Sequence, residues 1–86
     1  MIKIIEILNI DTDNFEVKVL CSDNKTYLFR LNRMFDDDVP VGMQNTWKLL
    51  IQNDNFSRVK IIYGDLVWEY CEILHSEIPQ YLEVTK

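Results

Sequence analysis

Residues 56–82 constrain the fold most, because two short apolar strand patterns stand there on either side of a turn signal. The patterns cover Arg58–Tyr63 and Leu66–Cys71, and the pair Gly64-Asp65 separates them. A glycine followed by an aspartate is typical of a tight turn between two strands. We therefore expect an antiparallel strand pair in the second half of the chain.

The first half predicts three more strands. Ile2–Ile10 carries apolar residues on both faces, as expected of a central strand or of a strand that contains a bulge. Phe15–Cys21 alternates between apolar and polar residues, which indicates a half-buried strand. The central Asp-Asn pair of Ser22–Lys25 suits a two-residue turn with positive φ angles. The return strand then covers Thr26–Leu31, which completes an antiparallel meander.

One helix is expected between the two groups of strands. Apolar residues recur there with helical spacing, at Met43, Trp47, Leu50 and Ile51. Asn53–Asn55 ends this helix, which covers about Met43–Gln52. Ser76 and Pro79 suit the N-cap and the first turn of a short closing helix, which ends near Leu82. Residues 1–86 are thus expected to form a single α+β domain, with an antiparallel sheet of about five strands packed on one α-helix.

The charge of the chain limits its partners. Fourteen acidic and nine basic residues give a formal net charge of -5. Binding to nucleic acid or to an anionic membrane depends on cationic side chains, so the charge disfavours both. No stretch approaches the roughly 20 apolar residues that span a bilayer. A protein partner with a basic surface fits best, and homo-oligomer formation stays open.

The chain offers little for catalysis or cofactor binding. Cys21 and Cys71 lack metal-ligand spacing and are expected to be buried free thiols of a cytoplasmic protein. His75 is the only histidine, and no nucleophile signature surrounds it. We predict no catalytic residue, no metal site, no cofactor and hence no enzyme activity.

Candidate partner-binding residues follow from residue type. The run Asp36, Asp37 and Asp38 is typical of a solvated loop, and it can also attract a cationic partner. Trp47, Tyr70 and Tyr81 are candidates because large aromatic side chains are enriched at interface hot spots. For Trp47, and also for Trp68, packing in the core is the stronger expectation.

Several short motifs resemble a small bacterial family known as domain of unknown function 2442. They are the hairpin Cys21–Asn24, Phe56 with Val59, the pair Val67-Trp68 and the closing turn Ser76–Leu82. Residues 69–71 stand where that family has a turn, and we expect the strand to continue to Cys71 instead. The resemblance implies an α+β fold and a bacterial or phage protein encoded beside a second small protein, as in toxin-antitoxin pairs.

These expectations lead to a non-catalytic interaction module, an antitoxin-like partner of another small protein. Two other classes stay open. An acidic phage-type inhibitor of a nucleic-acid-binding host enzyme, such as a CRISPR or restriction effector, would space its carboxylates along one face. A small ligand-binding domain or enzyme would need a pocket lined by Trp68, Tyr70 or His75.

Overall fold

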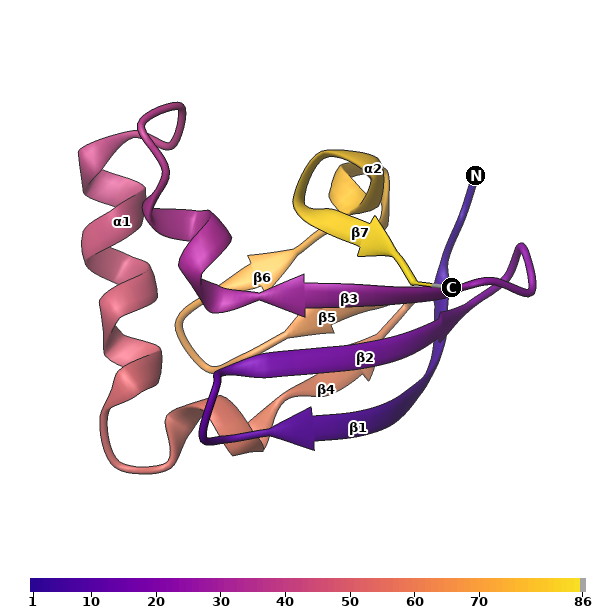
Figure 1. Ribbon diagram of the computed structural model, residues 1–86, viewed down its shortest axis with the longest axis horizontal. Coiled ribbons are helices and arrows are strands. Elements are labelled where there is room, and N and C mark those ends of the chain that lie inside the picture. The colour runs from indigo at the N-terminus through magenta and orange to yellow at the C-terminus, as the bar shows by residue number, and fades with distance from the viewer. Residues whose placement is uncertain (86) are drawn as a thin grey trace.

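A computed structural model describes residues 1–85 and confirms the α+β class (Figure 1). Its strands form two antiparallel sheets, where a single sheet was expected. Sheet A has the order β1-β2-β3-β7, and sheet B has the order β4-β5-β6. The strands are β1 (Ile4–Asp11), β2 (Glu16–Cys21), β3 (Thr26–Arg30), β4 (Lys60–Ile62), β5 (Asp65–Val67), β6 (Glu72–Ile73) and β7 (Leu82–Val84). The helices are α1 (Val41–Trp47) and α2 (Ile78–Tyr81), with 3₁₀ turns η1 (Leu31–Phe35), η2 (Lys48–Ile51), η3 (Asn55–Arg58) and η4 (His75–Glu77).

The predicted meander forms sheet A as β1, β2 and β3. Every second residue from Val17 to Cys21 is fully buried, which confirms the alternation. The hairpin turn differs from the prediction, since only Asn24 has a positive φ, of 65°. Its N–H bonds to the carbonyl of Cys21, while the Cys21 N–H bonds to the carbonyl of Lys25. The turn is therefore wider than a primed two-residue turn.

Strand β1 is bulged and lies at one edge of sheet A, so the bulge expectation is right and the central position is wrong. Two register shifts each insert one residue opposite β2. As a result Ile4, Ile7 and Ile10 pack against the core at intervals of three residues. The intervening Ile5 and Leu8 are 58% and 42% exposed. The bulges explain why the strand reads as apolar on both faces.

Helix α1 is shorter than predicted, because the chain tightens into the 3₁₀ turn η2 after Trp47. Trp47 and Leu50 are buried as expected. Met43 and Ile51, assigned to the same apolar face, are 39% and 52% exposed. A 3₁₀ turn advances three residues per turn instead of 3.6, so the predicted stripe does not stay in line. The expected stop follows, with positive φ angles in the Asn53-Asp54 pair.

Sheet B differs most from the prediction. Its first turn is centred on Tyr63 and Gly64, with φ angles of 51° and 82°, instead of on Gly64-Asp65. A Cβ atom on Gly64 would lie 2.7 Å from the Lys3 side chain, so only glycine fits there. The second strand ends at Val67, and the chain turns before the unpredicted strand β6. The prediction that this strand continues to Cys71 is thus wrong.

The C-terminal segment turns as expected but starts differently. Leu74, rather than Ser76, holds the N-cap position of η4, and its N–H donates to Glu77 Oε1 at 2.9 Å. Pro79 lies in the first turn of α2, as predicted. Strand β7 then pairs with β3 and adds a fourth strand to sheet A. The sequence does not predict this strand, because three residues are too few to show a periodic pattern.

The core is built around four aromatic side chains between the sheets and α1. The Trp47 and Trp68 rings meet edge to face at 5.5 Å, and Phe29 lies 5.2 Å from Trp68. Phe56 packs on Trp68 at 5.7 Å. In Figure 1, α1 stands at one end of the two sheets, and sheet B lies behind sheet A. The aromatic cluster joins these three parts of the fold.

Candidate functional site

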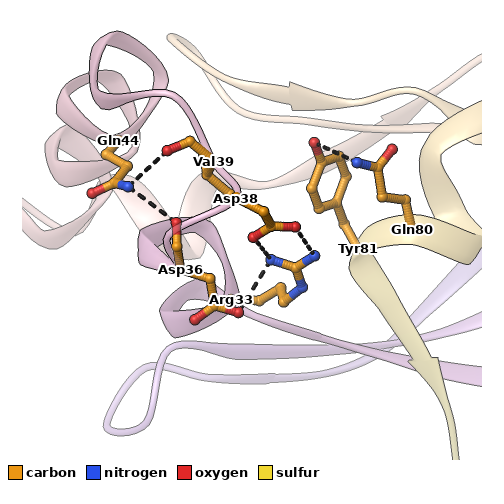
Figure 2. A network of polar contacts seen from close by, with 7 residues as sticks. All are labelled: Arg33, Asp36, Asp38, Val39, Gln44, Gln80 and Tyr81. Carbon is orange, nitrogen blue, oxygen red and sulfur yellow. Dashed lines mark hydrogen bonds and ion pairs between the residues drawn. The ribbon is translucent and has the colours of Figure 1, made fainter.

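The acidic loop, residues Asp36–Asp38, is folded around a single arginine (Figure 2). Arg33 Nη1 donates to Asp36 Oδ2 at 3.1 Å, and Arg33 makes two further hydrogen bonds to Asp38 at 3.0 and 2.9 Å. This paired geometry is the strong form of an arginine–carboxylate contact. The Arg33 hydrogen bond lowers the pKa of the Asp38 carboxyl. Two of the three predicted partner-binding aspartates are therefore engaged inside the domain.

The acidic loop is also anchored to α1. Gln44 Nε2 donates to the backbone carbonyls of Asp36 and Val39, at 3.1 and 2.8 Å (Figure 2). Asp37 is exposed, and within residues 1–85 its side chain has no hydrogen bond or ion pair. Only Asp37 fits the predicted role of a freely solvated carboxylate.

Tyr81 and Trp47 are core residues instead of partner contacts. The Tyr81 side chain is only 9% exposed, and the Arg33 guanidinium lies 5.4 Å from its ring centroid. Its hydroxyl accepts a hydrogen bond from Gln80 Nε2 at 3.1 Å (Figure 2). Trp47 is 3% exposed within the aromatic cluster. Burial corrects the partner-binding role of both rings, because almost none of either side chain is exposed to a partner.

Tyr70 is the remaining aromatic candidate, and it is 53% exposed. It lies on the loop Trp68–Cys71 between β5 and β6, which we call the Tyr70 loop. The Trp68 N–H donates to the Cys71 carbonyl at 2.8 Å and closes this loop. Trp68 Nε1 donates to the Phe56 carbonyl at 2.9 Å, and Cys71 Sγ donates to the Thr46 carbonyl at 3.5 Å. The buried neighbours thus fix the loop and leave Tyr70 at the surface.

Two shallow hollows adjoin the Tyr70 loop. One, of about 290 Å³, is lined by Tyr70 together with Glu69 and Glu72. The other, of about 170 Å³, lies between Tyr70 and the α1 residue Met43, which is 39% exposed. Among residues 1–85, neither Glu69 nor Glu72 forms an ion pair. The site therefore combines an exposed ring, an apolar neighbour and two unpaired carboxylates.

The sequence did not identify Met43, Glu69 or Glu72 as site residues. The alternation of Leu66, Trp68 and Tyr70 predicts a continuing strand, in which Glu69 would point to the opposite face from Tyr70. The change of direction after Val67 places both glutamates around one loop instead. The acidic residues on both sides of an exposed tyrosine were the only available signal.

His75 has an orienting partner that the sequence did not reveal. Asp65 Oδ1 lies 2.7 Å from His75 Nδ1 and accepts the His75 backbone N–H at 2.7 Å. The two side chains are 29% and 19% exposed. Within the described residues, no hydroxyl or thiol hydrogen-bonds to His75, and His75 does not line the hollows beside Tyr70. The pair fixes the β5–β6 region without a neighbouring nucleophile.

The two cysteines are free and buried, which confirms that they are not bonded to each other. Burial raises the pKa of Cys71 to about 11. Burial and the charge of Asp23 raise the pKa of Cys21 to about 11 as well. Both thiols stay protonated near neutral pH, and a protonated thiol is a poor nucleophile.

Residues 1–85 show neither a metal-binding cluster nor a membrane-spanning helix. In this part of the chain, no three His, Cys, Asp or Glu side chains gather in a way that could hold a metal ion. The same residues contain no helix that is long and apolar enough to cross a bilayer.

Comparisons with protein-family models, curated proteins and solved structures found no match to this chain. The resemblance to domain of unknown function 2442 stays a prediction.

Proposed function

We propose that the protein is a non-catalytic protein-binding domain whose Tyr70 loop receives a partner with a basic surface. The observation that carries this proposal is the half-exposed Tyr70 ring beside two glutamates that form no ion pair within residues 1–85. Tyrosine is enriched at interface hot spots, because its ring buries a large area at low entropic cost. Exposed carboxylates steer a cationic partner toward such a ring.

The most specific form of the proposal is an antitoxin-like role toward a small basic protein in the cytoplasm. The net charge of -5 suits a basic partner. The two unpaired buried thiols suit a reducing compartment. The family resemblance of the hairpin and strand motifs, which stays a prediction, implies the same role.

Imitation of a nucleic-acid backbone has less support. Such an inhibitor needs carboxylates spaced along one face, whereas many carboxylates of this chain have partners inside the domain. These are Asp11, Glu16, Asp23, Asp36, Asp38, Asp65 and Glu77. Their internal contacts favour a local docking site over an extended acidic face.

The proposal can be tested with a blocked tetrapeptide of alternating lysine and leucine, titrated into the ¹⁵N-labelled domain. We expect amide shifts concentrated in residues 69–72 and at Met43, and their loss in Tyr70→Ala. Tyr63→Ala is the matched control, because Tyr63 is 91% exposed on the β4–β5 turn and lies outside the site. Equal losses in both variants, or shifts spread over the whole surface, would contradict a site at Tyr70.

The charge requirement has its own pair of variants. Glu69→Gln with Glu72→Gln removes two charges at the site, and Asp13→Asn with Asp54→Asn removes two elsewhere. Each exposed ion pair is worth about 0.2–1 kcal/mol, so the loss of two charges should weaken binding roughly two- to thirtyfold. The control should change it by less than about twofold. Equal weakening would show that only the net charge matters.

A further inference from the structure

The outer face of sheet B carries a row of side chains that changes from positive to negative. Lys60 pairs with Val67 across β4 and β5, and Val67 pairs with Glu72 across β5 and β6. Leu66 and Ile73 are buried on the inner face. Because successive side chains of a strand point to opposite faces, Val67 and Glu72 point outward. Lys60, Val67 and Glu72 thus form one row across the sheet.

The positive end of the row is widened by Arg58. With Lys60 it lines a third hollow, of about 300 Å³, whose wall also includes the apolar residues Ile62 and Val67 and the carboxylate of Glu69. Among the described residues neither Arg58 nor Lys60 forms an ion pair, whereas the two other arginines of the chain do. The two unpaired cations outnumber the single carboxylate of this hollow, and beside the apolar surface they suit a carboxylate attached to an apolar group.

We propose that the partner contacts this face with a short extended segment that carries a carboxylate, apolar residues and a cation in that order. This inference rests on the proposed function and names the chemistry of the partner. The carboxylate binds at Arg58 and Lys60, the apolar residues cover Val67, and the cation lies beside Glu72 and the Tyr70 loop. The segment can run in either chain direction, because the row fixes only the order of charges.

The geometry of the sheet sets the spacing of these charges. Adjacent strands lie about 4.8 Å apart, so Lys60 and Glu72 are about 10 Å apart along the row. A segment in the extended polyproline II conformation advances about 3.1 Å per residue and turns the same side outward every three residues, so a step of three residues covers that distance on one face. The partner charges should therefore stand at positions i and i+3.

A second copy of this chain is a poorer occupant, although a row of opposite charges is self-complementary under a twofold axis. The strands of sheet B are only two or three residues long. Three strands of this length offer a face of roughly 10 by 10 Å. A stable interface buries about 800 Å² on each partner, far more than this face supplies.

The test uses four blocked peptides, Asp-Leu-Leu-Lys, Lys-Leu-Leu-Asp, Lys-Leu-Leu-Lys and Asp-Leu-Leu-Asp, titrated into the ¹⁵N-labelled domain. We expect at least one of the two mixed-charge peptides to bind about two- to fivefold more tightly than either like-charged peptide, as exposed ion pairs allow. In Lys60→Glu the preference should move to Lys-Leu-Leu-Lys. Lys18→Glu, on the exposed side of sheet A, makes the same charge change and should leave the preference unaltered.

The outcomes separate this inference from the proposed function. If Lys-Leu-Leu-Lys binds as tightly as the mixed peptides and still requires Tyr70, the charge order is wrong and the basic-partner site stands. If no peptide shifts residues 69–72, the proposed function fails. If the wild type forms a dimer in sedimentation that Lys60→Glu dissociates, a second copy is the occupant and the proposed segment is overturned.

Discussion

The acidic loop and the Tyr70 loop both carry carboxylates, but they use them differently. Asp36 and Asp38 are bound to Arg33, so the acidic loop contributes to the fold. Glu69 and Glu72 have no ion-pair partner within residues 1–85 and flank an exposed ring. The denser run of charge is therefore the less available one. Whether a carboxylate is free to bind a partner depends on which cation the fold places beside it. The number of acidic residues in a segment does not predict this.

The largest expected effect separates the inner and outer aromatic residues around the same hollow. Trp47 and Tyr70 both line it, but Trp47 is 3% exposed and Tyr70 is 53% exposed. Trp47→Ala should lower the free energy of unfolding by about 3–5 kcal/mol, because it removes a buried ring and leaves a cavity. Tyr70→Ala should change it by less than about 0.5 kcal/mol. Urea denaturation of both variants measures the difference, and similar losses would remove the distinction between core and site.

Arg33→Gln tests whether the ion pairs with Arg33 keep the aspartates of the acidic loop from binding a partner. We expect a loss of about 1 kcal/mol in the free energy of unfolding, because the pairs are partly exposed and the stacking on Tyr81 is also removed. The freed aspartates should then bind the lysine-leucine peptide as a second site, visible as new amide shifts in residues 36–38. Arg30→Gln is the matched control, since Arg30 pairs with Glu16 away from both loops. The comparison between the loops would fail if Arg33→Gln produced no new site.

The pH dependence of Asp38 gives a smaller effect with a defined sign. Its pKa in the folded protein lies below the ordinary value of 3.8, chiefly because Arg33 hydrogen-bonds to the charged carboxylate. Its stabilising contribution should be complete above pH 3.8 and should be lost as the pH falls through the lowered pKa. Carboxyl ¹³C shifts should follow this titration, and Arg33→Gln should move the midpoint upward. An unchanged midpoint in that variant would show that Arg33 does not hold Asp38 charged.

The strong alternation of apolar and polar residues made much of the fold predictable, but the shortest strands could not be predicted. Strands β2 and β3 follow from their period of two residues. Strands β6 and β7 have two and three residues, which is too short to show any period. The alternation through Tyr70 even continues past the end of β5, so the sequence predicts a strand where the chain turns. What ends that strand is the packing of Trp68 and Cys71 against η3 and α1, through contacts distant in sequence.

The candidate site was less predictable than the fold for the same reason. Tyr70 could be named from residue type, but its exposure depends on the turn after Val67. The pair of His75 and Asp65 depends on the β5–β6 pairing, which places residues ten positions apart side by side. The engagement of Asp38 by Arg33 could have been suspected from their closeness in sequence. The sequence shows which side chains are present, and the pairing of the strands determines which of them come into contact.

The smallest expected effect concerns the rate of association. Replacing all three aspartates of the acidic loop with asparagine should slow binding of the lysine-leucine peptide by at most about twofold and slightly flatten its salt dependence, because exposed charges act over roughly 10 Å at about 0.1 M salt. Glu69→Gln with Glu72→Gln removes fewer charges but should slow binding more, since these carboxylates are unpaired and adjoin Tyr70. NMR line-shape fits at low and high salt measure both rates. If the triple variant were the slower of the two, the acidic loop would be the steering surface, and the ranking of the two loops would be reversed.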